Sequence, residues 1–267
     1  MREIIENRKL IWKLARNDFN KRYAGSSLGA VWALIQPVVT VLMYWVVFEF
    51  LLGNKYQSIA GGVEVPYVLY LTAGLVPWFF FSEAWNYGTS SLLAYQYLVK
   101  KVVFNIRILP VIRVTAAMFI HVFFAFVLIV IAGCYGYYPS VYTLQLAYYS
   151  IALAVFTLGM SYITSAIVVF FRDLTQIISI ALQLGMWATP ILWDISMAEK
   201  WGAVFGYVVK LNPVCYIVNG YRSAIYGEQW FFETPVYTVY FWVVSLAILW
   251  LGRRLFDKLK YHFADVM

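Results

Sequence analysis

Residues 108–132 read ILPVIRVTAAMFIHVFFAFVLIVIA, a run of 25 residues in which Arg113 is the one charged side chain. A helix needs about 20 apolar residues to cross the roughly 30 Å hydrocarbon core of a bilayer. The stretch Ile108–Ala132 therefore predicts a transmembrane helix. It decides the class of fold, because a run of this length is typical of a membrane span and not of a soluble core helix.

The rest of the chain has the composition that such a helix requires. Of its 267 residues, 63% are hydrophobic and 12% are charged, against roughly 45–50% and about 25% in an average soluble domain. A soluble globule of this composition would lack the polar surface to cover its core. Composition thus excludes a soluble enzyme, a disordered chain and a nucleic-acid-binding module, and it predicts an integral membrane protein.

Five further apolar runs predict membrane spans, which makes an all-α protein with six transmembrane helices. These runs are Leu28–Leu52, Val65–Asn86 with a kink at Pro77, Leu144–Phe171, Leu174–Leu192 closed by Pro190, and Val236–Leu251. The first 28 residues are too charged for a signal peptide. We expect a single domain over 1–267, with an interfacial helix in 1–27, the six-helix region in 28–251 and a cytoplasmic tail in 252–267.

Basic residues are distributed unevenly between the two sets of loops. Sixteen Lys and Arg residues lie in 1–27, in 93–113, at Arg172 and in the C-terminal tail, whereas four lie in the remaining loops. Cytoplasmic loops carry an excess of Lys and Arg. Both termini are therefore predicted to be cytoplasmic.

The stretch Trp201–Gly227 is also apolar, but a seventh span there would place the basic C-terminal tail outside. Irregular backbone at membrane depth is tolerated only where protein or a water-filled cavity surrounds it. We therefore predict two short re-entrant or interfacial helices on the outer side, broken at Asn212-Pro213. Such helices could cap the outer mouth of a passage.

Several kinds of catalytic site are missing from the sequence. It contains no Gly-Lys dipeptide, so a P-loop is impossible, and its two His residues, His121 and His262, make no metal cluster. We predict no catalytic residue, metal or cofactor in this chain. Glu49, Glu83 and His121 are the candidates for an ion relay, although His121 is better interpreted as a neutral imidazole hydrogen-bonded to a neighbouring helix. The chain is thus a passive pore, or a partner supplies its energy.

Two cytoplasmic segments have features of contact surfaces. Ile4–Tyr23 is amphipathic at helical spacing, with Arg8 and Arg22 intruding on its apolar sector, which is typical of a helix in the membrane interface. The capping residues Thr89–Ser91 precede Leu92–Phe104 and predict a short cytoplasmic helix. Each segment has two interpretations, a contact with a partner or a purely local role as a membrane anchor or connecting helix.

Three motifs, in order along the chain, resemble those of a known family. They are WKLARNDFNKRY at 12–23 with GSSLG at 25–29 and Trp32…Pro37, then FFRDL at 170–174 with Gln176 and TPI at 189–191, then Asn212-Pro213 with Tyr221-Arg222. The chain resembles the ABC-2 type permeases that export polysaccharides, the membrane subunits for O-antigen, capsule and teichoic acid. The resemblance implies a homodimer bound to two copies of a separate P-loop ATPase, which carries ATP and Mg²⁺. It also implies a bacterial inner membrane and a lipid-linked polysaccharide as cargo, with O-antigen preferred.

The resemblance further implies roles for particular residues. The segments expected to contact the ATPase contain Trp12, Arg16, Asp18, Phe19, Arg22, Tyr23, Tyr97, Lys100 and Lys101. The outer gate would contain Asn212, Pro213, Tyr221 and Arg222. The rings expected along the channel, where they could stack on the C–H faces of sugars, are Trp32, Tyr44, Trp45, Phe48 and Trp187. Trp and Tyr are also enriched at membrane interfaces for reasons unrelated to cargo.

Arg172 and Asp173 lie in the tight turn between the fourth and fifth predicted spans. Either they form an ion pair that fixes the turn, or Arg172 meets the anionic diphosphate of a lipid carrier at the channel entrance, since Arg suits bidentate phosphate contacts. Other functions stay open, namely an ABC-2 permease for a small molecule or lipid, a stand-alone channel or ion-coupled carrier, and a membrane-embedded enzyme. Cys134 and Cys215 could pair only if their Cα atoms came within about 7 Å.

Overall fold

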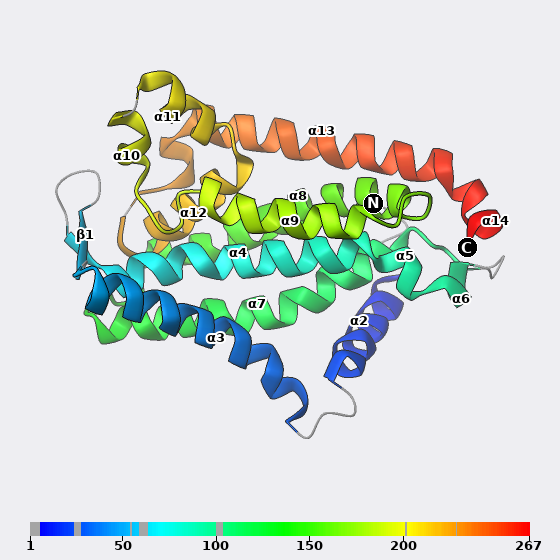
Figure 1. Ribbon diagram of the computed structural model, residues 1–267, viewed down its shortest axis with the longest axis horizontal. Helices are drawn as coiled ribbons and strands as arrows, with labels where there is room; N and C mark the ends of the chain where they lie inside the picture. The colour runs from blue at the N-terminus through cyan, green and yellow to red at the C-terminus, as the bar shows by residue number, and fades with distance from the viewer. Residues whose placement is uncertain are drawn as a thin grey trace.

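The structure is a computed structural model of a helical protein (Figure 1). It describes residues 6–23, 28–53, 55–58, 64–99, 104–200, 202–227 and 229–267. Within these residues the one sheet is an antiparallel hairpin of β1, Tyr56–Ser58, and β2, Glu64–Pro66. The predicted all-α fold class is confirmed.

Among the described residues, five helical segments are long and apolar enough to cross a membrane. They are α3 (Trp32–Trp45) continued by the π-helix η2 (Val46–Leu51), α4 (Tyr67–Thr89), α7 (Ile108–Cys134), η3 (Val141–Leu144) with α8 (Gln145–Val168), and α13 (Pro235–Leu259) with η6 (Lys260–His262). The remaining predicted span is α9, Leu174–Ala188, with 15 residues, which is fewer than the roughly 20 that span a bilayer without thinning it. The chain is a multi-pass membrane protein, and six spans stay a prediction.

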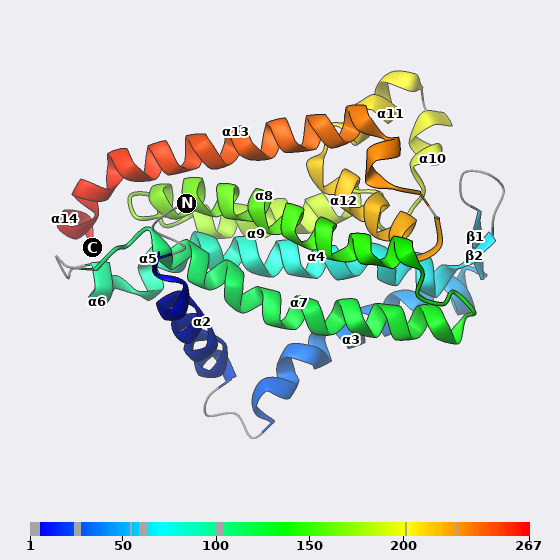
Figure 2. The same ribbon diagram turned by 180° about the vertical axis from the view of Figure 1, so that it is seen from behind.

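Shorter elements occupy the two ends of the long helices. They are α2 (Arg8–Tyr23), η1 (Gly29–Val31), α5 (Ser91–Ala94), α6 (Gln96–Val99), α10 (Ile195–Lys200), α11 (Ala203–Lys210), α12 (Pro213–Arg222), η4 (Ser223–Gly227), η5 (Phe231–Glu233) and α14 (Phe263–Val266). In Figures 1 and 2, α10, α11 and α12 lie at one end of the bundle, and α5, α6 and α14 lie at the other.

The helix α4 is the centre of the bundle, in contact with α7 on one side and α8 on the other (Figure 1). Its side chains are buried on every face from Tyr67 to Trp78, so α4 is hydrophobic all round, as a helix enclosed by others must be. α13 packs along α8, and α2 packs against α7. α3, by contrast, buries little of its surface: of its residues with a described side chain, only Ala33 is buried.

Two predicted boundaries at the α14 end are wrong. α13 continues past Leu251 to Leu259, because Phe256 is fully buried there and meets the ring of Tyr162. The predicted single helix Leu92–Phe104 is instead the pair α5 and α6, separated at Tyr95. Residues 100–103, and with them Lys100 and Lys101, lie outside the described residues.

The predicted N-cap before that loop is also wrong. α4 runs on to Thr89, and Ser90 does not cap the following turn with its side chain. The Ser90 hydroxyl instead donates backwards to the carbonyls of Asn86 and Tyr87, at 3.4 and 3.2 Å. Ser and Thr hydroxyls compete in this way for backbone groups of the preceding turn.

Candidate functional site

The helix α2 has one face packed on α7 and another left open. Ile11 and Ala15 are 5% and 0% exposed and join the core at this end of the bundle. Trp12 is 59% exposed, although its ring meets Phe119 of α7 edge-on at 4.9 Å between centroids. The amphipathic helix predicted from the sequence is therefore present, and the structure packs it directly against a long apolar helix.

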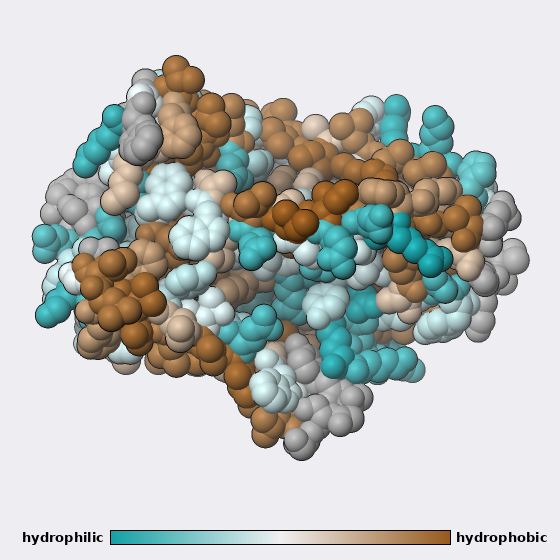
Figure 3. All heavy atoms as spheres, in the orientation of Figure 1, coloured by the Kyte–Doolittle hydropathy of each residue, from teal (hydrophilic) through white to brown (hydrophobic). Residues whose placement is uncertain are grey.

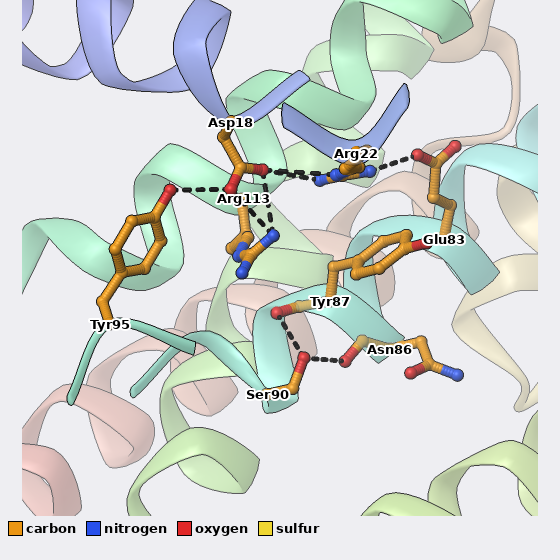
Figure 4. Close-up of polar contacts among 8 residues, drawn as sticks. All are labelled: Asp18, Arg22, Glu83, Asn86, Tyr87, Ser90, Tyr95 and Arg113. Atoms are coloured by element: carbon orange, nitrogen blue, oxygen red, sulfur yellow. Dashed lines mark hydrogen bonds and ion pairs between the residues drawn. The ribbon is translucent and has the colours of Figure 1, made fainter. Parts of the chain in front are cut away.

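A cluster of charged and polar side chains ties α2 to α4, to α7 and to the junction of α5 and α6 (Figure 4). The Asp18 carboxylate accepts from Arg22 at 3.0 Å, from Arg113 of α7 at 2.8 Å, and from the Tyr95 hydroxyl at 2.6 Å. Arg22 also donates to Glu83 of α4 at 2.6 Å. Two guanidinium groups thus share two carboxylates, with Asp18 bridging both.

Burial makes this cluster strongly interdependent. The side chains of Asp18 and Arg22 are 6% and 8% exposed, and that of Arg113 is 10% exposed. The Arg22 guanidinium also lies over the Tyr87 ring, 3.8 Å from its centroid, where a cation is attracted by the π face. Buried charges are tolerated when paired and hydrogen-bonded, and each charge here has a partner of opposite sign.

The phenol of Tyr95 completes the cluster at the junction of α5 and α6. Burial, and then its hydrogen bond to the Asp18 carboxylate, raise the pKa of Tyr95 above its usual range. The hydroxyl therefore stays protonated and donates to Asp18. Through this bond the loop that follows α4 is held to α2, so the two segments singled out as contact surfaces are joined to each other.

Asp18 and Arg22 have their partners within this chain. The resemblance places them among the residues that contact an ATPase, but both side chains point into the protein and pair with Arg113 and Glu83 of this chain. The charges of Asp18 and Arg22 are thus paired within this chain, and their contact with an ATPase stays a prediction. Arg113 lies in α7, as the predicted span Ile108–Ala132 requires, although its charge was also counted with the loop residues 93–113.

A second cluster surrounds the end of α9 at the opposite end of the bundle. The helix ends at Ala188, and Thr189 is extended, as expected of a residue before Pro190. The carbonyls that follow accept from two tyrosines of α4: Tyr67 donates to Leu192 and Tyr70 to Trp193, each at 2.9 Å.

Arg222 of α12 closes the same turn from the other side. Its two terminal nitrogens donate to the carbonyls of Pro190 and Ile191 at 2.7 and 2.9 Å. Its guanidinium also lies 3.6 Å from the centroid of the Tyr70 ring. These bonds satisfy two carbonyls of the turn that follows α9, so Arg222 attaches α12 to that turn.

The predicted break at Asn212-Pro213 is confirmed. α11 ends at Lys210 and α12 begins at Pro213. Asn212 is the N-cap, since its side-chain oxygen accepts from the Val214 amide at 3.0 Å, while its amide nitrogen donates to Thr189 at 2.8 Å. One side chain therefore both starts α12 and connects it to the end of α9.

Replacing Asn212 by alanine should destabilise this end of the protein. Losing an N-cap costs about 0.5–2 kcal/mol, and the bond to Thr189 adds a net contribution of roughly 0.5–1.5 kcal/mol. Asn212→Asp keeps the cap and loses only the donor, so its melting temperature in detergent should lie between those of the wild type and Asn212→Ala. Equal losses for the two variants would show that the cap contributes nothing.

His121 lies where α7, α8 and α12 meet. Its Nε2 is 2.8 Å from the Tyr221 hydroxyl and 3.0 Å from the Ser150 hydroxyl. The hydrogen bonding predicted for His121 is thus present. Tyr221, predicted to belong to the outer gate, is fully buried and holds α12 against α7 and α8.

The family model described as ABC-2 type transporter matches residues 9–226. The chain belongs to the ABC-2 type transporter family. The matched region runs from α2 to η4 and so includes both clusters. Two curated relatives are similar over nearly their whole length. One, from Myxococcus xanthus, is 27% identical over 99% of this chain and 98% of its own, and one from Klebsiella pneumoniae is 26% identical over 97% and 95%. Both are named O-antigen export system permease protein RfbA.

In this ABC-2 transporter chain the other residues predicted to contact an ATPase differ in exposure. Trp12 and Tyr97 are 59% and 55% exposed, and Arg16 is exposed on α2. Phe19 is half-buried and meets the Phe119 ring edge-on. The Tyr23 side chain lies outside the described residues. Their contact with a partner stays a prediction.

The aromatic residues predicted along the channel lie on α3, its extension η2, and α9. Tyr44 reaches the sulfur of Met186 on α9 at 3.9 Å, and the Phe48 ring lies 5.2 Å from that of Tyr67. Trp45 donates to Glu49 one turn further along. Trp32 and Trp187 are 49% and 56% exposed, so these two are available for contact with another molecule.

The tight turn before α9 is held by the backbone. Arg172 and Asp173 are both exposed and do not form an ion pair with each other, which makes the first interpretation of this turn wrong. The Asp173 carbonyl accepts from the Gln176 amide at 3.0 Å, and the Arg172 carbonyl accepts from the Thr175 hydroxyl at 3.1 Å. The Arg172 guanidinium is left exposed at the start of α9.

Sequence reasoning missed Arg113, Tyr95, Tyr67 and Tyr70 as members of the two clusters. A signal existed for Arg113, since it is the one charge in an otherwise apolar run, and charges in such runs are seldom left without a partner. Nothing in the sequence set Tyr67 and Tyr70 apart from the other tyrosines, because the chain has 22 of them. Among the described residues, no group of His, Cys, Asp and Glu could hold a metal ion, and Cys134 and Cys215 are both free.

Proposed function

We propose that this chain is the membrane-spanning permease of an ATP-driven exporter that moves a lipid-linked polysaccharide, O-antigen, from the cytoplasmic side across the bacterial inner membrane. The observation that carries the proposal is the near full-length similarity to two permeases named for O-antigen export, within a family that matches most of the chain. The functional unit in this proposal is a homodimer bound to two copies of a P-loop ATPase, which holds ATP and Mg²⁺. Both termini face the cytoplasm.

The exposed faces of α3 and α9 support a passage between two copies. In Figure 3, hydrophobic residues gather over α3, α9 and α13, and hydrophilic residues gather between α9 and α2. Gln176, Ser179, Gln183 and Trp187 are exposed and recur at helical spacing along one stripe of α9. A polar stripe that ends in an exposed indole suits a hydrated polymer that slides past without being held.

The α2 cluster supports the proposed coupling. In an ABC exporter, work done by the ATPase must reach the long helices through a contact that has little freedom to move. The exposed side of α2 carries Trp12 and Arg16, and its buried side is ion-paired to α4 and α7. A movement of α2 would therefore move the central helix α4 directly.

The test of this proposal is the recovery of the tagged chain from its native membrane in mild detergent, with mass spectrometry of what accompanies it. A P-loop ATPase in stoichiometric amount is the expected result. Recovery of the chain alone, in several mild detergents and at native expression, would contradict the proposal and return attention to an ion-coupled carrier. Export of teichoic acid, capsule or a small molecule would keep the class and change the cargo.

Replacing Arg172 by alanine should lower export by about tenfold or more, since a charge-assisted hydrogen bond contributes roughly 1.5–3 kcal/mol. The reason is that Arg172 is exposed at the start of α9 and can meet the phosphate groups of a lipid carrier. The measurement is polymer at the cell surface, with the complex quantified in the same membranes. Lys258→Ala removes an exposed cation from the same end of the bundle and should leave export unchanged. An equal loss of export in both variants would show that export depends on the positive charge at this end of the bundle and not on Arg172 itself.

A further inference from the structure

A cavity of about 690 Å³ lies among α10, α12, η4 and the start of α13. Its volume falls in the range of roughly 300–1,000 Å³ that small-molecule sites occupy. These elements lie at the end of the bundle opposite α14 (Figure 2). No residue of α3 or α9 lines the cavity, so it is separate from the surface proposed above as the passage.

Many of the residues that line the cavity have aromatic rings with a polar group. Six tyrosines and Trp230 line it, together with the side-chain amides of Asn219 and Gln229. Aromatic rings present flat surfaces to the C–H faces of a polyol, while phenols and amides offer hydrogen bonds to its hydroxyl groups. A purely apolar ligand would leave these polar groups without partners.

Among the described residues that line the cavity, basic residues outnumber acidic ones. Lys200, Lys210 and Arg222 line it, with Asp194 as the one acidic residue among the described lining residues. Arg222 is 6% exposed, and its terminal nitrogens donate to two carbonyls. No carboxylate of the described residues pairs with it, and its Nε has no hydrogen-bond partner among them. Arg is always ionised, so this buried positive charge favours an anion nearby.

Tyr226 supplies a second unpaired donor on the same wall. It is 8% exposed, and its hydroxyl has no hydrogen-bond partner among the described residues. Burial raises the pKa of Tyr226 above its usual range, so the hydroxyl keeps its proton. A buried donor without a partner is unfavourable in a folded protein unless something else accepts from it. Two such donors in one cavity therefore indicate a site built for an acceptor.

We infer that this cavity binds a phosphate ester of a polyol, with the phosphate towards Arg222 and Lys200 and the hydroxylated body against the rings and Tyr226. Arg and Lys recognise phosphate, and the rings accommodate the carbon skeleton. Two sources have this chemistry, a sugar phosphate of a glycan and the phosphoglycerol headgroup of a membrane lipid. The inference does not depend on the proposed cargo or on an ATPase partner.

Binding of glucose 1-phosphate to the purified full chain, in mild detergent with whatever subunits accompany it, tests the inference. Saturation-transfer NMR should show saturable binding of glucose 1-phosphate and weaker binding of glucose. Tyr226→Phe removes only the unpaired hydroxyl, so it should leave the melting temperature unchanged or higher and weaken binding by about three- to tenfold. Lys200→Gln should weaken binding of glucose 1-phosphate and leave that of glucose unchanged.

Tyr207→Phe is the matched control, because Tyr207 is 67% exposed on α11 and does not line the cavity. Equal affinity in Tyr226→Phe and Tyr207→Phe, or glucose binding as tightly as glucose 1-phosphate, would overturn the inference. Displacement by short-chain phosphatidylglycerol distinguishes the sources. If this lipid displaces glucose 1-phosphate and binds more tightly, the ligand is a lipid headgroup, and the reverse order assigns a sugar phosphate. These readouts need no transport, so they are independent of the test of the proposed function.

Discussion

Replacing Asp18 by alanine is expected to destabilise the protein by about 3–5 kcal/mol, the cost of removing one partner from a buried ion pair. Asp18 is the one carboxylate that bridges Arg22 and Arg113. Arg22 would keep Glu83, but Arg113 has no other ion pair among the described residues and is 8% exposed. A buried guanidinium would then be left without a counter-charge, and the Tyr95 hydroxyl would lose its acceptor.

Thermal unfolding in detergent measures this loss, at about 2–4 °C for each kcal/mol in a domain of 150–250 residues. The control is Asp257→Ala, which breaks the pair with Arg107, whose side chains are 27% and 40% exposed. Exposed pairs contribute about 0–1 kcal/mol, so the control should hardly change the melting temperature. A loss no larger for Asp18→Ala than for Asp257→Ala would contradict the interpretation of the cluster.

A double variant separates a missing charge from a distorted helix. Asp18→Asn combined with Arg113→Met removes the carboxylate and the cation that it neutralises, and buried ion pairs are often replaced by apolar residues without loss. The double variant should therefore be more stable than Asp18→Asn alone. If the two losses simply add, Asp18 and Arg113 do not depend on each other.

The order of the long helices could be predicted from the sequence because each is a local property of the chain. Length and hydropathy located α7 to within a few residues, and Pro190 correctly predicted the end of α9. The end of α13 could not be predicted in this way, because Phe256 extends the helix by packing on Tyr162. That contact forms only in the folded protein, so it cannot be predicted from local hydropathy.

The α2 cluster shows the same limit for functional residues. Arg22 was visible as a charge that intrudes on an apolar sector, but its partner Glu83 lies 61 positions away in the chain, and Arg113 lies 95 positions from Asp18. One sequence without tertiary contacts cannot pair them. The turn at Asn212-Pro213 was predictable for the opposite reason, since an N-cap and a proline at the first helical position act within a single turn.

Replacing Gly159 by alanine should destabilise the crossing of α8 and α13 by about 1–3 kcal/mol, the usual cost of overpacking a well-packed interior. A Cβ atom at Gly159 would lie 2.8 Å from the Leu249 amide nitrogen and 3.0 Å from its Cα. These are backbone atoms, so no side-chain rotation can relieve the clash. Gly252 lies on the α13 side of the same crossing. A Cβ atom added at Gly252 would lie 2.7 Å from the Gly159 carbonyl oxygen. Small residues let membrane helices approach this closely.

The control for this change is Gly133→Ala in α7, where a Cβ would have no neighbour within 4 Å. A Gly→Ala substitution that creates no strain typically stabilises by about 0.4–1 kcal/mol, so the two alanine variants should shift the melting temperature in opposite directions. Gly159→Leu should lower it further, because its larger side chain must push α13 away from α8. If Gly159→Ala were as stable as Gly133→Ala, the close approach of α8 and α13 would not exist in the membrane protein. A separated α13 would then expose Phe241 and Ser245, both now fully buried.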